Sequence, residues 1–236
     1  MSLQSVLLIL LGWNLLLAAS AFVFESVEGF SFLGFGEGSL VTFYSGFQLL
    51  LLSWIAFKVL QSRRSEEKAL WKSPAFVWVL ITSGFLFLAA DELLALHEMA
   101  DGLIHDSLGL TETGLTDRID DAIIGLFGLI GLGVLVLYRS EFTSFGGAYR
   151  FFGLGFAFLF IMVGFDVLTN RNDLLPKIVG EARSESLFLT LSHVEEVFKL
   201  YSEAFFILAF TVIFRGSVAM DRDEEKVPGH GEVALT

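Results

Sequence analysis

Long apolar stretches alternate with short polar segments along the chain. The six apolar stretches cover about residues 5–24, 40–60, 76–97, 121–138, 150–169 and 194–214. All are too long for strands, and none shows the alternation of polar and apolar residues that is typical of a membrane barrel. A hydrocarbon core about 30 Å thick is crossed by about 20 helical residues. The pattern therefore predicts an all-α, polytopic membrane helix bundle with six transmembrane helices.

Composition supports this prediction and excludes several other classes. Of the 236 residues, 54% are hydrophobic, whereas soluble domains contain about 45–50%. The chain has no cysteine, which excludes disulfides, thiolate metal sites and a cysteine nucleophile. The formal net charge of −12 argues against a nucleic-acid partner, because phosphate binding needs a basic surface. Membrane lipid is the expected partner, and the 26 phenylalanines could also contact other membrane proteins.

The distribution of Lys and Arg predicts the orientation. Ten of the fifteen basic residues fall in the 58–72 and 139–150 segments and in the tail after the sixth stretch. By the positive-inside rule, both termini are cytoplasmic, and the loops near 25–40, 98–120 and 170–193 are outside.

The first stretch has two interpretations. Its Ala18-Ala19-Ser20-Ala21 segment resembles a signal-peptide cleavage site, but no Lys or Arg precedes it and the apolar run continues to Phe24. We therefore expect a retained helix. The expected organisation is a six-helix transmembrane domain over 1–215 and a short polar cytoplasmic tail over 216–236.

Acidic residues gather in the predicted outer half. Nineteen of the 27 Asp and Glu residues and three of the four histidines lie there. A field this negative concentrates cations and repels anions. In the DELLALHE segment, Asp91 and Glu98 are seven residues apart, which returns to within about 20° of the same face of one continuous helix.

The sixth stretch carries a polar stripe. His193, Glu196, Lys199 and Glu203 share an arc of about 120° on a helix, and Glu203 lies near the predicted bilayer middle. An ionisable group at this depth costs about 2.5–3.5 kcal/mol or more, so each needs a partner. Lys199 neutralises only about one of the nearby carboxylates.

A bound divalent metal ion would supply the missing positive charge. Carboxylates and imidazoles without thiolates suit Fe, Mn or Zn, and all-oxygen sets suit Ca or Mg. The alternative is a hydrated acidic vestibule with protonated or salt-bridged carboxylates. The candidate metal ligands are Asp91, Glu98, Glu196 and Glu203, followed by His193, His97, Asp166 and Asp121.

Standard catalytic motifs are absent from the sequence. It contains no HExxH, no GxSxG and no Walker loop, and the Glu-x-x-His spacing of soluble di-iron bundles is not found. No residue is identified as a nucleophile or general base. Small residues at three- or four-residue spacing predict close helix packing: Gly125, Gly128 and Gly131 in the fourth stretch, and Gly153 with Ala157 in the fifth.

Two sequence patterns resemble those of a group of uncharacterised bacterial multi-pass membrane proteins. They are the DE and HE pairs of the third stretch and the EE-x6-E pattern of the sixth. The resemblance rests on Asp91, Glu92, His97, Glu98, Glu195, Glu196 and Glu203. It implies a bacterial inner membrane and no chemistry; the positive-inside rule then predicts that the site faces the periplasm or exterior.

Three functions are compatible with this sequence. The first is a metal-dependent membrane protein; as an enzyme, it would act on a lipid or other apolar substrate. The second is a cation or proton transporter that uses the same carboxylates, although the apolar run 204–214 offers no polar route onward from Glu203. The third is an accessory subunit of a larger membrane complex.

Overall fold

The structure of the chain is a computed structural model. It describes residues 2–24, 31–36, 38–63, 73, 75–111, 113, 116–169 and 174–226. The part of the predicted tail beyond residue 226 lies outside the described residues.

Six helical segments are long and apolar enough to cross a membrane, which confirms the predicted spans. The fold is an all-α bundle, and its described residues form no strand. The spanning helices are α1 (Leu3–Phe24), α2 (Leu40–Arg63), α3 (Phe76–Leu94), α5 (Ile119–Leu137), α7 (Tyr149–Thr169) and α9 (Glu181–Lys226). Short helices connect them: η1 (Ser31–Leu33), α4 (Leu96–Leu108), η3 (Thr116–Arg118), α6 (Arg139–Phe142), η4 (Thr143–Ala148) and α8 (Leu175–Val179).

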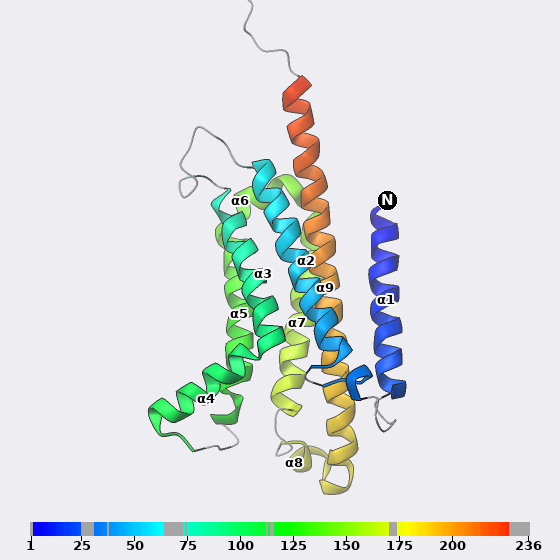
Figure 1. The fold of residues 1–236 in the computed structure, drawn as a ribbon, viewed down its shortest axis with the longest axis vertical. Helices are drawn as coiled ribbons and strands as arrows, with labels where there is room; N and C mark the ends of the chain where they lie inside the picture. Colours follow the sequence, from blue (N-terminus) through cyan, green and yellow to red (C-terminus); the bar gives the residue numbers. More distant parts are fainter. Residues whose placement is uncertain are drawn as a thin grey trace, which may run out of the picture.

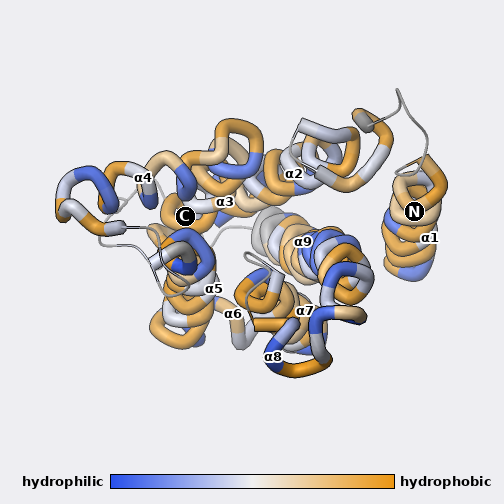
Figure 2. The backbone as a smooth tube through the Cα atoms, turned by 90° about the horizontal axis from the view of Figure 1, so that it is seen from below, coloured by the Kyte–Doolittle hydropathy of each residue, from blue (hydrophilic) through white to orange (hydrophobic). Residues whose placement is uncertain are grey.

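The helix α9 is the centre of the bundle. Helices α1, α2 and α7 all pack against it, and α3 packs on α2 (Figures 1 and 2). Its side chains Leu208, Ala209 and Ile213 are fully buried or nearly so, and Leu52 of α2 joins the same core. Because α9 touches three other spanning helices, polar side chains in its central part meet neighbouring helices.

Much of the remaining helix surface is apolar and exposed. Leu8 of α1 is 72% exposed and Leu137 of α5 is 80% exposed. Figure 2 shows hydrophobic residues along the outward sides of these helices. An apolar surface this extensive is expected to face hydrocarbon, since lipid tails are as apolar as leucine side chains. The chain is therefore a multi-pass membrane protein.

The two ends of the bundle differ. We call the end that carries α4 and α8 the α8 end, and the opposite end, which carries α6, the α6 end (Figure 1). At the α6 end, Arg63 Nε donates to Glu141 Oε1 at 2.8 Å, and Trp78 Nε1 donates to the same oxygen at 3.1 Å. This contact ties α2, α3 and α6 together around one buried carboxylate.

The third predicted stretch is divided by a sharp break, which corrects the expected continuous helix over 76–97. Ala95 adopts a left-handed conformation with φ of 50° and separates α3 from α4. Asp91 and Glu98 therefore lie on two different helices, and the predicted shared stripe is wrong. The reason is local: Asp91 Oδ1 accepts the backbone N–H of His97 at 2.8 Å and so caps the first turn of α4.

The helix that contains the sixth predicted stretch extends beyond the apolar residues at both ends. Helix α9 begins at Glu181, ahead of the predicted start near 194, and continues to Lys226, past the predicted domain end at residue 215.

Candidate functional site

The side chain of Lys199 joins α9 to α3. Its Nζ lies 2.9 Å from Glu92 Oε1 and 2.8 Å from Glu196 Oε2. All three side chains are at least three-quarters buried, with exposed fractions of 18%, 16% and 23% for Lys199, Glu92 and Glu196. Two carboxylates therefore share one ammonium, and the group carries a net negative charge when all three are ionised.

Glu203 lies about one turn beyond Lys199 on α9. It is 6% exposed, and its Oε1 accepts a hydrogen bond from Ser45 Oγ of α2 at 2.6 Å. The described residues give Glu203 no ion pair, and its Oε2 accepts no hydrogen bond from them. An ionised carboxylate in this position therefore has no ion-pair partner among the described residues to balance its negative charge.

Two uncharged polar residues are buried near the same level, and sequence analysis did not single them out. Asn14 of α1 is 0% exposed and donates through Nδ2 to the carbonyl of Leu200 on α9 at 2.7 Å. Gln48 of α2 follows Ser45 by one turn and is 1% exposed. In the sequence, each stands out only as a polar residue inside an apolar span. Such residues often serve helix packing and not function.

A second acidic group lies where α5 and α7 approach α9. Asp166 of α7 is in side-chain contact with Asp121, at the start of α5, and lies close to Glu195 of α9. Glu195 Oε2 accepts a hydrogen bond from Thr169 at 3.1 Å. Two carboxylates in contact need a proton or a cation between them, because like charges at hydrogen-bond distance cannot both stay ionised at low cost.

A third group surrounds the α3–α4 break. His97 Nδ1 lies 3.1 Å from Asp91 Oδ2, and His97 Nε2 lies 3.9 Å from Glu98 Oε1. The hydrogen bond that Asp91 accepts raises the pKa of His97 above its usual value, and the negative charges of Asp91, Glu98 and Asp120 act in the same direction, while burial opposes them. This pair is placed to hold a proton near the α8 end.

His193 sits in an aromatic environment. Its ring stacks on Phe35 with centroids 4.7 Å apart and meets Phe22 edge-on at 5.3 Å. Phe22 is near the end of α1, and Phe35 lies in the segment between α1 and α2. The imidazole therefore helps to hold this segment against α9.

The eight predicted metal ligands thus fall into several groups instead of one. Within the described part of the chain, no three His, Asp or Glu side chains are arranged to hold a metal ion. The structure brings together Asp91, His97 and Glu98 at the α3–α4 break, and Asp121 with Asp166, while Glu196 and Glu203 lie along one side of α9 with separate partners. A divalent metal ion at these residues stays a prediction.

Sequence analysis missed Glu92 as a partner of Lys199. The helical positions place Glu92 away from Asp91, but they cannot show which neighbouring helix it faces. The predicted outer half of the bundle contains few basic residues, and this was the available signal. Any carboxylate in that half competes for Lys199.

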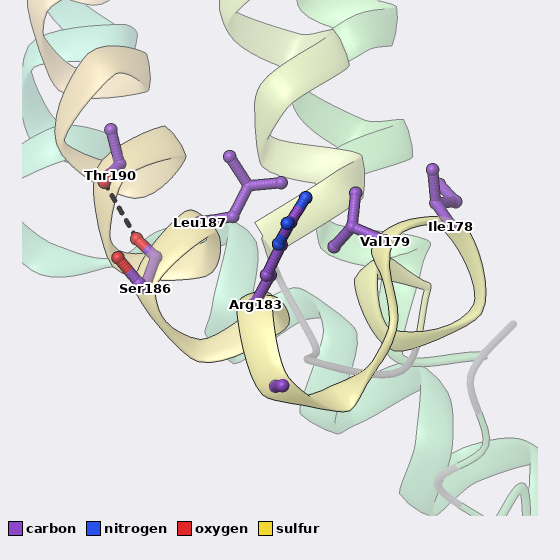
Figure 3. Close-up of a pocket in the computed structure, with 7 residues that line it drawn as sticks. Ile178, Val179, Arg183, Ser186, Leu187 and Thr190 are labelled. Atoms are coloured by element: carbon purple, nitrogen blue, oxygen red, sulfur yellow. Dashed lines mark hydrogen bonds between the residues drawn. The ribbon is translucent and has the colours of Figure 1, made fainter.

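The α8 end also carries an open pocket of about 650 Å³. Figure 3 shows Arg183 extending between Leu187 and Val179, with Ser186 and Thr190 on the neighbouring turn of α9. The pocket is lined by Ile178, Val179, Ala182, Arg183, Ser186, Leu187 and Thr190. None of the buried carboxylates lines it.

Comparison with known proteins gives one match. The family described as "Domain of unknown function (DUF8692)" matches residues 22–214, which is most of the chain. No curated protein and no solved structure gives a match.

Proposed function

The chain belongs to this family of unknown function, and we propose that it is a cation-transporting membrane protein whose buried carboxylates on α9 take up a small cation. Both protons and monovalent metal ions fit this proposal. The cation enters from the α8 end, which carries most of the acidic residues and which the positive-inside rule places outside. The proposed location is a bacterial inner membrane, with the α8 end facing the periplasm or exterior.

The observation that carries the proposal is the position of Glu203. An ionisable side chain inside a membrane is costly and marks ion and proton pathways in membrane proteins. Glu203 is 6% exposed, receives one hydrogen bond from Ser45, and has no ion pair among the described residues. Lys199 is already bound to Glu92 and Glu196, so it does not compensate Glu203 fully. An added cation or proton would compensate this charge.

The groups nearer the α8 end support a path toward Glu203. The acidic pair Asp121 and Asp166 and the Asp91–His97 pair offer exchangeable protons at the mouth of the bundle. Glu195 and Glu196 are adjacent in sequence but face different neighbours, Thr169 of α7 and Lys199 of α9. Glu195 therefore lies between the Asp121–Asp166 pair and Lys199, whose charges both act on it.

Ion flux in proteoliposomes tests the proposal. Purified protein is reconstituted, a gradient of protons, Na⁺ or K⁺ is imposed in turn, and uptake is followed with ion-sensitive dyes. We expect wild-type protein to carry at least one of these ions and Glu203→Gln to lose the flux. The matched control is Glu185→Gln, which changes an exposed glutamate on the same helix and leaves flux intact. Equal flux in wild-type and Glu203→Gln liposomes would refute the proposal.

A metal-dependent enzyme is the second candidate, and the contact between Asp121 and Asp166 favours it. Carboxylates in contact can share a divalent ion such as Fe, Mn or Zn instead of a proton. A lipid or other apolar substrate would then enter between helices. Elemental analysis of gently purified protein, beside Asp166→Asn, tests this candidate. Stoichiometric metal that is lost in the variant supports it, and metal-free wild-type protein with normal folding refutes it.

A further inference from the structure

Helices α1, α2 and α9 each place a buried polar side chain at one level of the bundle. Ser45 of α2 contacts Glu203 of α9 directly, and Gln48 lies one turn from Ser45 on the same helix. Asn14 of α1 holds the carbonyl of Leu200, three residues before Glu203. A helix carbonyl points toward the C-terminal end, so the amide of Asn14 lies near the level of Glu203.

Several polar atoms of these residues have no partner among the described residues. They are Asn14 Oδ1, both amide atoms of Gln48, and Glu203 Oε2. Asn14, Gln48 and Glu203 are 0%, 1% and 6% exposed. Buried polar groups in folded proteins are almost always hydrogen-bonded, and water is scarce within the hydrocarbon region. Helices α1 and α2 both pack against α9, and these unpaired atoms are the observation from which we argue for a ligand between the three helices.

The donor set identifies the class of this ligand. Amide carbonyls, a hydroxyl and a carboxylate are hard oxygen donors, and no imidazole or thiolate is among them. Hard oxygen donors suit alkali and alkaline-earth ions better than Fe, Mn or Zn. Glu203 is the one carboxylate in this donor set and balances one positive charge, so we take the ion as monovalent.

We propose that Asn14, Ser45, Gln48 and Glu203 form a sodium site where α1, α2 and α9 meet. This inference rests on the proposed function and names its ion as Na⁺. Asn14 and Gln48 supply neutral oxygens, Glu203 supplies the charge, and Ser45 orients the carboxylate through its hydroxyl. The site also assigns a role to Asn14, the fully buried polar residue of α1.

Equilibrium binding of radioactive Na⁺ to the purified full-length protein tests the site. Wild-type protein should bind about one Na⁺ per chain, and Asn14→Leu, Gln48→Leu and Glu203→Gln should each weaken binding by about tenfold or more. Ser53→Ala is the matched control: it removes a buried hydroxyl from α2 that donates to Thr82 O at 2.9 Å, and binding should be unchanged. Excess K⁺ and Mg²⁺ are added separately as competitors.

A second measurement covers variants that fail to fold. Because a ligand that binds only the folded state raises stability by mass action, Na⁺ should raise the thermal unfolding midpoint of wild-type protein more than equal K⁺ does. If wild-type protein shows proton flux that depends on Glu203 but does not bind Na⁺ saturably, the sodium site is overturned. The proposed function then stays intact. Na⁺ binding that is lost in all three variants, without any flux, supports the site and refutes transport.

Discussion

At the scale of single residues, Lys199 decides the charge balance of the bundle interior. It is the ammonium that Glu92 and Glu196 share, and all three side chains are largely buried. Removal of one partner from a buried ion pair leaves an uncompensated charge, which costs more than the pair itself contributes. The site therefore depends on this lysine more than on either glutamate alone.

Lys199→Met should lower the free energy of unfolding by about 3–5 kcal/mol, because it leaves both carboxylates without their cation. Thermal unfolding in detergent measures the loss. Combining Lys199→Met with Glu92→Gln and Glu196→Gln should restore most of the stability, since the stranded charges are then removed. A triple variant as unstable as the single one would contradict this account.

The pair of His97 and Asp91 predicts a pH dependence. Since Asp91 raises the pKa of His97 above 6.5, the stabilisation is fully present below about pH 6.5 and is lost as pH rises through the raised pKa. Asp91→Asn should therefore lose stability mainly at low pH and flatten the profile. Thermal unfolding of both proteins across this range measures the difference, and parallel profiles would refute the assignment.

How far the sequence predicted the site depends on the kind of residue. Glu196 and Glu203 could be found because a charge inside an apolar span is rare. Asn14 and Gln48 could not, because a neutral polar residue in a span is common and its unpaired atoms are visible only in three dimensions. The partnership of Glu92 with Lys199 also needed the packing of α3 beside α9.

At the scale of helices, the six spans were predictable because an apolar run of this length forms few structures other than a membrane-spanning helix. The break at Ala95 was not, because alanine is the best helix former and no glycine or proline marks the position. The structure shows that the carboxylate of Asp91 competes for a backbone N–H and so starts a new helix. Side-chain capping of this kind depends on geometry that periodicity does not record.

The contact between α7 and α9 depends on Gly155. A Cβ atom there would lie 2.7 Å from the Phe206 ring, and the Gly155 carbonyl accepts a hydrogen bond from Ser202 Oγ at 2.9 Å. The sequence pattern favoured Gly153 instead, where a Cβ atom would meet nothing within 4 Å. Spacing alone could not distinguish the two glycines, because both allow close approach.

Gly155→Ala should reduce the stability of the bundle by about 1–3 kcal/mol, since the rigid ring of Phe206 leaves no room for a methyl group. Gly153→Ala, on the same helix, should have little effect or increase stability slightly. The thermal unfolding midpoints of the two variants compare the positions directly. Equal midpoints would show that α7 and α9 do not pack as closely as described.

At the scale of the whole molecule, the proposed direction of cation entry depends on the orientation of the bundle. The absence of cysteine makes this orientation easy to test, because a single introduced thiol is the only reactive one. Ser107 lies at the α8 end on α4, and Ser140 lies at the α6 end on α6; both are exposed. In intact cells, a membrane-impermeant thiol reagent should label Ser107→Cys and leave Ser140→Cys unlabelled. The reverse pattern would invert the proposed topology.

The central claim is that Glu203 takes up a cation, and infrared difference spectroscopy on reconstituted protein tests it most directly. Addition of Na⁺ or a change of pH should alter a band of one buried carboxyl group in the wild-type spectrum. The same change should persist in Glu185→Gln and disappear in Glu203→Gln. A wild-type spectrum that does not respond to any cation, or a response that survives in Glu203→Gln, would contradict the claim.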